Sequence, residues 1–124
     1  MIDFNNGALF KLKQISNEEI INQISPLLIS GEVVISSYKA MRDFVVFTSK
    51  RVIAVNVQGI TGTKKDFTSL PYSKIQAYSV ETAGTFDLDS ELEMYFSALG
   101  KVKFEFKGAS DIVKIGQIIS EFVL

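Results

Sequence analysis

Between residues 33 and 107, apolar and polar side chains alternate with the two-residue period of β-strands that bury one face. The alternation is clearest on the two sides of Leu99-Gly100, where single charged or polar residues separate the apolar positions. These apolar positions are Leu92, Met94, Phe96, Val102, Phe104 and Phe106. The pattern predicts an antiparallel hairpin with strands at 91–96 and 101–107. If Glu91 and Glu93 lie across from lysines of the second strand, each opposite-charge pair adds about 0.2–1 kcal/mol.

Five further strands are predicted before this hairpin, at 33–39, 44–48, 51–57, 64–70 and 76–82. Ser49-Lys50 has the length of a tight turn between the second and third of these strands. Other turn and breaker residues separate the later strands. They are Gln58, Gly59, Thr61 and Gly62 after the third strand, Pro71 after the fourth, and Ala83 and Gly84 after the fifth. The pattern therefore predicts seven strands in an antiparallel series.

The residues before the strands carry a helical pattern. Ser16 followed by Glu19 fits a capping box, and isoleucines recur on one helical face behind it. We expect a short helix at 17–25, within an N-terminal helical segment at 1–30. Residues 1–14 fit either a helical extension or a docked loop.

The chain ends in an amphipathic pattern that begins behind Ser110 and Asp111, two residues that can cap a helix. Large apolar residues then recur at helical spacing, at Ile112, Ile115, Ile118, Ile119 and Phe122. We predict a C-terminal helix at 110–123 that packs on the strands, since no basic stripe typical of a membrane-surface helix lies opposite. The length of 124 residues fits one domain, 1–124, with its β-structure at 33–107.

Composition narrows the function classes. The chain has no Cys and no His, which removes disulfides, thiol nucleophiles, imidazole bases and the usual zinc ligands. The net charge of -1 does not favour nucleic acid as a partner. The N-terminus lacks the pattern of a secretory signal, and no apolar run approaches the ~20 residues of a membrane-spanning helix. We therefore expect a cytoplasmic, non-enzymatic protein with no catalytic, cofactor-binding or metal-binding residues.

Residues 31–92 carry a series of short motifs in a specific order. They are Gly31-Glu32, Tyr38-Lys39, Arg42-Asp43, Phe47-Thr48, Lys50-Arg51, Gln58-Gly59-Ile60-Thr61-Gly62, Leu70-Pro71-Tyr72, Glu81-Thr82-Ala83-Gly84 and Asp87-Leu88-Asp89-Ser90-Glu91-Leu92. In this order the chain resembles the bacterial pleckstrin-homology-like domain family. The resemblance implies a mainly β fold, a partly open barrel of about seven antiparallel strands with a C-terminal capping helix and a short N-terminal helix.

The same resemblance implies assembly into rings through strands of neighbouring subunits, and no known enzyme activity. Phosphoinositide-binding members of the wider superfamily use a basic cluster on a roomy loop between the first two strands. Here the corresponding connection is Lys39-Ala40-Met41-Arg42-Asp43, which is short and contains an acid.

Two motifs invite ligand-binding interpretations. Gly59-Ile60-Thr61-Gly62 with Lys64-Lys65 lacks the spacing of a phosphate loop and is flanked by strands, so we favour a structural turn, with anion binding as the alternative. Asp87, Asp89 and Glu91 repeat at period two, but they lack the further oxygen ligands and the glycine of a calcium loop. We favour a solvated strand entrance or an acidic contact surface there.

Charge is divided unevenly along the chain. Residues 39–74 carry seven basic and two acidic side chains, a local charge of +5, whereas residues 81–93 carry five acidic side chains and no basic one. One interpretation is that these opposite charges meet within one subunit. The other is that they lie on different flanks and form a head-to-tail contact between copies, which closes into a ring when the rotation permits.

Two hypotheses for function follow. The first is an assembly module that forms a homo-oligomer and offers a surface to an unknown protein partner. Its candidate residues are Arg42, Asp43, Lys50, Arg51, Lys64, Lys65, Glu81, Asp87, Asp89 and Glu91. The second is a peripheral binder of anionic membrane lipid or of a phosphate ligand. Its candidate residues are Lys39, Arg42, Lys50, Arg51, Lys64 and Lys65.

Overall fold

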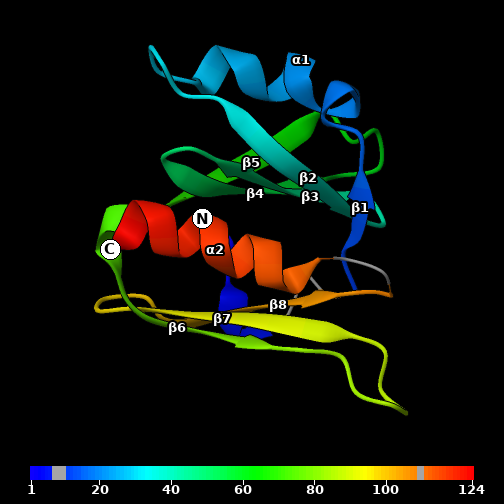
Figure 1. Ribbon diagram of the computed structural model, residues 1–124. Helices are drawn as coiled ribbons and strands as arrows, with labels where there is room; N and C mark the ends of the chain where they lie inside the picture. The colour runs from blue at the N-terminus through cyan, green and yellow to red at the C-terminus, as the bar shows by residue number, and fades with distance from the viewer. Residues whose placement is uncertain (7–10, 109–110) are drawn as a thin grey trace.

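The computed structural model describes residues 1–6, 11–108 and 111–124, which form two antiparallel sheets and a C-terminal helix (Figure 1). Five strands make the first sheet in the order β1-β2-β3-β4-β5, and three make the second in the order β6-β7-β8. The strands are β1 (Lys13–Ile15), β2 (Val34–Ala40), β3 (Asp43–Thr48), β4 (Arg51–Gln58), β5 (Lys64–Pro71), β6 (Ile75–Glu81), β7 (Ser90–Phe96) and β8 (Gly100–Phe106). The α-helices are α1 (Ile21–Ile24) and α2 (Ile112–Val123), and the 3₁₀ turns are η1 (Phe4–Asn6), η2 (Asn17–Glu19), η3 (Ser25–Leu27) and η4 (Tyr72–Lys74).

The two sheets are connected at two places. At one of them β5 passes through η4 into β6. At the other, Leu12 bridges to Phe106 of β8, with its amide 2.8 Å from the Glu105 carbonyl oxygen and its own carbonyl oxygen 2.9 Å from the Lys107 amide. The chain then continues from Leu12 into β1 of the first sheet. Together these connections curl the strands into a partly open barrel.

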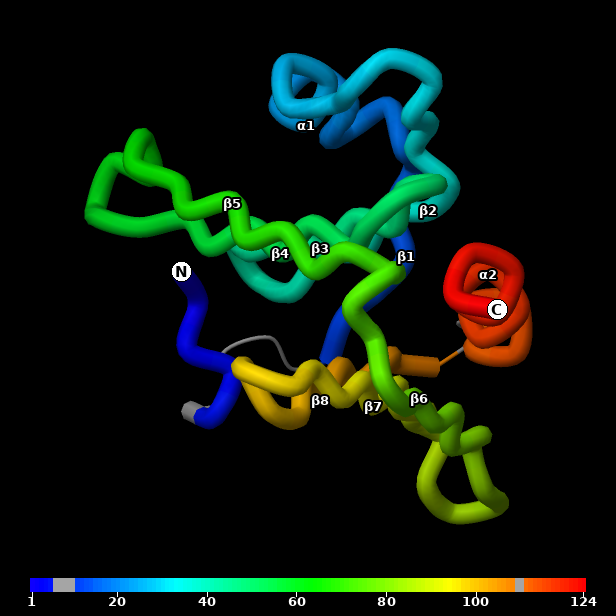
Figure 2. The backbone as a smooth tube through the Cα atoms, turned by 90° about the vertical axis from the view of Figure 1, so that its left-hand side faces the viewer, coloured from blue at the N-terminus to red at the C-terminus, as the bar shows by residue number. Residues whose placement is uncertain are grey.

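The main core lies between the sheets and takes side chains from both. Tyr38 of β2 packs edge-on against Phe47 of β3 and Phe106 of β8, with ring centroids 5.7 and 4.9 Å apart. Alternate residues of each strand supply the rest, because successive side chains of a strand face opposite sides of the sheet. Figure 2 shows α2 and the N-terminal segment on opposite sides of the space between the sheets. Ile2 of that segment belongs to the same core.

Helix α2 covers one open side of the barrel. It starts behind Asp111, whose carboxylate accepts a hydrogen bond from the Lys114 amide at 3.1 Å. Its buried residues are Ile112, Ile115 and Ile119. The Ser120 hydroxyl lies 2.7 Å from the hydroxyl of Tyr78 on β6. The helix is therefore held to the second sheet by both apolar and polar contacts.

A second apolar cluster lies on the outer face of the first sheet, beneath α1. Ile20 and Ile24 are fully buried there, together with Val46 of β3 and with Ile53 and Val55 of β4. Both faces of β3 and β4 are therefore covered. This explains why these two strands have apolar residues at consecutive positions instead of strict alternation.

The fold class is confirmed, with three differences in detail. The seven predicted strands match β2 to β8 to within one residue at each end, and the sequence pattern does not predict β1. The short N-terminal helix is present, but the predicted span 17–25 is divided into η2, α1 and η3, and α1 is a single turn. Pro26 has no amide hydrogen with which to continue the helix. The C-terminal helix starts at Ile112, two residues later than expected, and residues 7–10 and 109–110 lie outside the described part.

We predict that Ile119→Ala lowers the free energy of unfolding by about 2–5 kcal/mol, because its fully buried side chain fills the space between the sheets. Val113→Ala is the matched control on the exposed side of the same helix and should change it by less than about 0.5 kcal/mol. Urea unfolding followed by circular dichroism measures both. Equal losses would contradict the described packing of α2.

Candidate functional site

Arg51 forms an ion pair inside the subunit, although its sequence position made it a candidate for the interaction surface. Its Nε and Nη2 donate to the two carboxylate oxygens of Glu32, each at 3.0 Å. The Glu32 side chain is fully buried and also accepts a hydrogen bond from the Thr48 hydroxyl at 2.6 Å. Burial acts to raise the pKa of Glu32, but hydrogen bonds from Arg51, Thr48 and the Ile29 amide hold it below its ordinary value. Arg51 thus ties the loop before β2 to β4.

Arg42 and Asp43 both bind the end of β4, and Arg42 also binds the turn that follows it. The Arg42 guanidinium donates to the carbonyl oxygens of Gly59 and Val57 at 2.6 and 3.2 Å. The Asp43 carboxylate accepts from the Val57 amide at 2.9 Å. Gly59 and Gly62 have φ angles of +78° and +69°, which explains the two glycines. These hydrogen bonds give both charged residues a role in shaping their own subunit.

Two more basic side chains have partners in the subunit. The Lys65 ammonium donates to Gln23 Oε1 at 2.7 Å, and the Lys39 ammonium lies 5.4 Å from the centroid of the Phe44 ring. Four of the seven basic residues in 39–74 are therefore engaged within the fold, namely Lys39, Arg42, Arg51 and Lys65.

The side chains of Lys50, Lys64 and Lys74 have no hydrogen-bond or ion-pair partner among the described residues. Lys64 begins β5 at one end of the first sheet. Lys50 and Lys74 lie at the other end, where the Lys50 carbonyl accepts from the Tyr72 amide of η4 at 3.2 Å. An eight-residue strand such as β4 spans about 23 Å between these ends. The six bases considered for a phosphate or lipid ligand are therefore divided between two ends of the sheet.

Part of the acidic segment is neutralised within the second sheet. Glu91 and Glu93 of β7 lie 3.1 and 3.8 Å from Lys103 and Lys101 of β8. The strand register sets Glu93 opposite Lys103 but Glu91 opposite Glu105, so both ion pairs are diagonal. Of the two glutamates, Glu93 faces a lysine directly and Glu91 does not. Hydrogen bonding to Glu91 and its charge raise the pKa of Lys103.

The remaining acids, Glu81, Asp87 and Asp89, have no cationic partner in the described part of the chain. They lie at the end of β6 and in the β6–β7 loop (residues 82–89), which projects from the second sheet at the lower right of Figure 1. The Gly84 amide donates to the Asp87 carbonyl oxygen at 2.7 Å, and the Asp89 amide donates to Asp87 Oδ1 at 3.1 Å. Ala83 directly precedes Gly84. The two hydrogen bonds give the loop a defined shape.

Two large apolar side chains in this loop are exposed, and the strand pattern does not single them out. Phe86 is 100% exposed and Leu88 is 64% exposed. Single exposed apolar residues are common, whereas two of them beside unpaired acids form a small amphipathic surface. We call Phe86, Asp87, Leu88 and Asp89 the loop tip. The available sequence signal was a phenylalanine and a leucine between two predicted strands.

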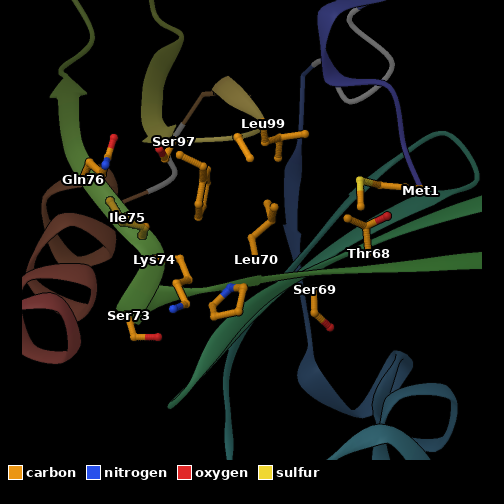
Figure 3. Close-up of a pocket in the computed structure, with 13 residues that line it drawn as sticks. Met1, Thr68, Ser69, Leu70, Ser73, Lys74, Ile75, Gln76, Ser97 and Leu99 are labelled. Carbon is orange, nitrogen blue, oxygen red and sulfur yellow. The ribbon is translucent and has the colours of Figure 1, made fainter.

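A pocket of about 440 Å³ opens between the sheets where β5 turns through η4 into β6. Its apolar lining includes Leu70, Ile75, Phe96 and Leu99, and Figure 3 shows Leu70 and Leu99 facing the same space. Lys74 carries the only charged side chain among the described residues that line it. Three separate segments form this pocket, so no single sequence motif marks it.

The pocket and the loop tip lie at opposite ends of the same two strands. β6 begins beside the pocket at Ile75 and ends at Glu81, where the loop starts. β7 returns from the loop to Phe96, which lines the pocket and pairs with Ile75. The two features are therefore separated by about 20 Å along the strands, since each residue advances a strand by about 3.3 Å.

The described residues contain no cluster of three or more acidic side chains that could hold a metal ion. No helix in the described ranges has the length and apolar character needed to cross a bilayer. The cytoplasmic location of the chain stays a prediction.

Two antiparallel sheets around one core, with a C-terminal helix over an open side, define the pleckstrin-homology-like class. The family model described as the bacterial PH domain matches residues 3–123. The chain belongs to this bacterial PH domain family, which confirms the resemblance found in the sequence. Neither the family nor the curated relatives indicate a catalytic class.

Relatives cover nearly the whole chain. It is 41% identical over 119 residues to the uncharacterized protein YjqA of Bacillus subtilis strain 168, across 94% of this chain and 95% of that protein. A DUF1696 family protein with a pleckstrin-homology domain from Shewanella loihica has a TM-score of 0.80 and 36% identity, covering 92% of this chain and 98% of that one. A pleckstrin homology domain from Shewanella amazonensis has a TM-score of 0.66 and 39% identity, covering 89% and 90%.

We predict that Arg51→Met lowers the free energy of unfolding at pH 7 by about 3–5 kcal/mol, because it leaves the Glu32 carboxylate buried without a cation. Lys50→Met, at the exposed neighbouring position, is the matched control and should have little effect. In the folded wild type, the pKa of Glu32 lies below its ordinary value of 4.5. The stabilisation that the ionised Glu32 contributes is therefore complete above pH 4.5 and declines as the pH falls through the folded pKa.

The deficit of Arg51→Met should therefore shrink in acid, where a protonated Glu32 needs no cation. Urea unfolding at pH 7 and at pH 4 measures the difference between the variant and the wild type. A deficit that is the same at both pH values, or that Lys50→Met shares, would contradict the role assigned to this pair.

Proposed function

We propose that this bacterial PH domain is a non-enzymatic assembly module that self-associates into a ring-shaped homo-oligomer and presents a surface to a protein partner. The observation that carries the proposal is the position of the unpaired charges. Glu81, Asp87 and Asp89 lie at the loop end of β6, whereas Lys50 and Lys74 lie at the end where η4 leads into β6.

Opposite charges at opposite ends favour a heterologous contact, in which one end of a copy meets the other end of the next. Such a contact repeats from copy to copy, and it closes into a ring when the rotation between copies permits. A two-fold contact between antiparallel copies also brings opposite ends together, but it stops at a dimer. The charge distribution therefore supports contacts between opposite ends of neighbouring copies, and the mass of the assembly separates a ring from a dimer.

Charge alone does not supply the affinity. Exposed ion pairs contribute about 0.2–1 kcal/mol each, and salt screens them over a Debye length of about 10 Å at 0.1 M. Charge complementarity sets orientation and association rate more than strength. A stable oligomer therefore needs apolar surface in the contact as well.

The non-enzymatic part of the proposal is supported by chemistry. The sequence has no His and no Cys, the two side chains most used as general base and thiol nucleophile. The 440 Å³ pocket is lined mainly by apolar side chains and small hydroxyl groups, with one lysine. This lining suits the binding of an apolar group better than acid–base chemistry.

Light scattering coupled to size exclusion tests the assembly. We expect a discrete species well above the monomer mass of 13.8 kDa at low salt, and a partial shift toward smaller species at high salt as the ion pairs are screened. A monomer at both salt concentrations, at protein concentrations up to the millimolar range, would overturn the proposal.

Binding to an anionic lipid or phosphate ligand is the alternative function, and one observation favours it. Lys13 of β1 pairs directly with Lys39 of β2, and both side chains are exposed. Because the other bases are engaged or distant, we expect no flotation with phosphatidylserine vesicles beyond that with neutral vesicles. Flotation at low salt that Lys13→Glu with Lys39→Glu abolishes would support the alternative instead.

A further inference from the structure

The loop tip has the features of one half of an interface. Phe86 is 100% exposed, so its ring is not part of the subunit's own core. The hydrogen bond from the Gly84 amide to the Asp87 carbonyl oxygen and the one from the Asp89 amide to Asp87 Oδ1 hold the loop in one shape. A ring presented on a preformed loop loses little conformational freedom on binding, which favours its use as an anchor.

The pocket has the features of the other half. Its 440 Å³ lie within the range of about 300–1,000 Å³ that is typical of binding pockets, and its apolar walls suit an aromatic ring. Lys74 at this pocket is exposed and unpaired among the described residues. If the aromatic ring beside Asp87 and Asp89 entered this pocket, Lys74 would lie close to the two carboxylates.

A subunit cannot place its own loop tip in its own pocket. β6 and β7 join the two features and hold them about 20 Å apart along the strands. The loop tip can therefore reach a pocket only on another molecule.

We propose that the loop tip of one copy inserts Phe86 and Leu88 into the pocket beside Lys74 of a second copy. When each copy gives its loop to one neighbour and receives the loop of another, the contact is heterologous and repeats around a ring. This inference rests on the proposed self-association and assigns its contact surfaces. The apolar side chains supply the affinity, and the acids beside them meet Lys74 and set the direction.

Two single substitutions disable the two halves separately. Phe86→Ser removes the anchor and leaves the pocket intact. Ala98→Trp adds a large ring at an exposed position of the pocket lining and leaves the loop intact. Ile60→Ser is the matched control for the first variant, because Ile60 is also fully exposed, at 103%, but lies in the turn between β4 and β5.

Light scattering of each variant alone should show a monomer at concentrations where the wild type and Ile60→Ser are oligomeric. Removing the buried ring should weaken association by roughly 10- to 100-fold. An equimolar mixture of Phe86→Ser and Ala98→Trp should form a dimer and nothing larger, because only one complete contact is possible between them. This dimer is the signature of a contact between the loop tip and the pocket, and a wild-type species larger than a dimer shows that the contact runs head to tail.

The other outcomes separate the two proposals. A monomeric wild type overturns both the self-association and this contact. An oligomeric wild type whose size Phe86→Ser does not change overturns the contact and leaves the self-association standing. Two monomeric variants that stay monomeric when mixed also overturn the contact. Thermal unfolding checks each variant, and Ser97→Trp, at the adjacent exposed lining position, replaces Ala98→Trp if the latter does not fold.

Discussion

The packing of α2 against the second sheet is the contact on which the rest of this structure depends. Two sheets joined at a corner leave an open side, through which water would reach the core around Tyr38 and Phe106. Helix α2 covers this side and approaches β6 closely. A Cβ atom on Gly116 would lie 2.9 Å from Val80 Cγ2, closer than ordinary contacts allow, so the glycine permits the approach. The contact also sets the position of β6, the strand that separates the pocket from the β6–β7 loop.

Most of the charge that seems available in the sequence is used to build the subunit. Arg51 neutralises the buried Glu32, Arg42 binds turn carbonyl groups, and Glu91 and Glu93 pair diagonally with lysines of β8. Ion pairs of this kind add specificity to a fold more than they add stability. In the two charged segments 39–74 and 81–93, the side chains without a partner among the described residues lie at or beyond the ends of strands; they are Lys50, Lys64, Lys74, Glu81, Asp87 and Asp89. This distribution makes those ends, and not the sheet faces, the candidates for recognition.

The strands could be predicted because their burial follows a local rule. Apolar and polar side chains alternate along a strand that has one face in the core, whichever strand it pairs with. The strands at 91–96 and 101–107 could therefore be predicted from their own sequence. β1 could not be predicted, because three residues are too few to show a period and its pairing with β2 depends on distant sequence. The helix at 17–25 was expected to be continuous, but the curved outer face of the first sheet is covered by short turns instead.

The candidate site was harder to predict than the strands, because it also depends on contacts between residues distant in sequence. The sequence indicates where acids and bases concentrate. It does not show that Glu32 and Arg51, 19 positions apart, form an ion pair inside the subunit. The pocket draws on Met1, on the continuous segment from β5 through η4 into β6, and on the β7–β8 turn with the end of β7, so no single stretch of sequence marks it. Phe86 lies outside the predicted strands, and its full exposure in the structure distinguishes it from the core phenylalanines.

The central claim is that the loop tip of one copy contacts the pocket of another. Disulfide cross-linking between copies tests it most directly, because the chain has no cysteine of its own to cause background. Thr85→Cys places a thiol in the β6–β7 loop, and Ser97→Cys places one at the pocket, both at exposed positions. On mild oxidation, the account predicts a mixed dimer when the two single variants are combined, and a series of larger species when one chain carries both. A mixture without the mixed dimer, or Thr85→Cys alone dimerising equally well, would contradict it.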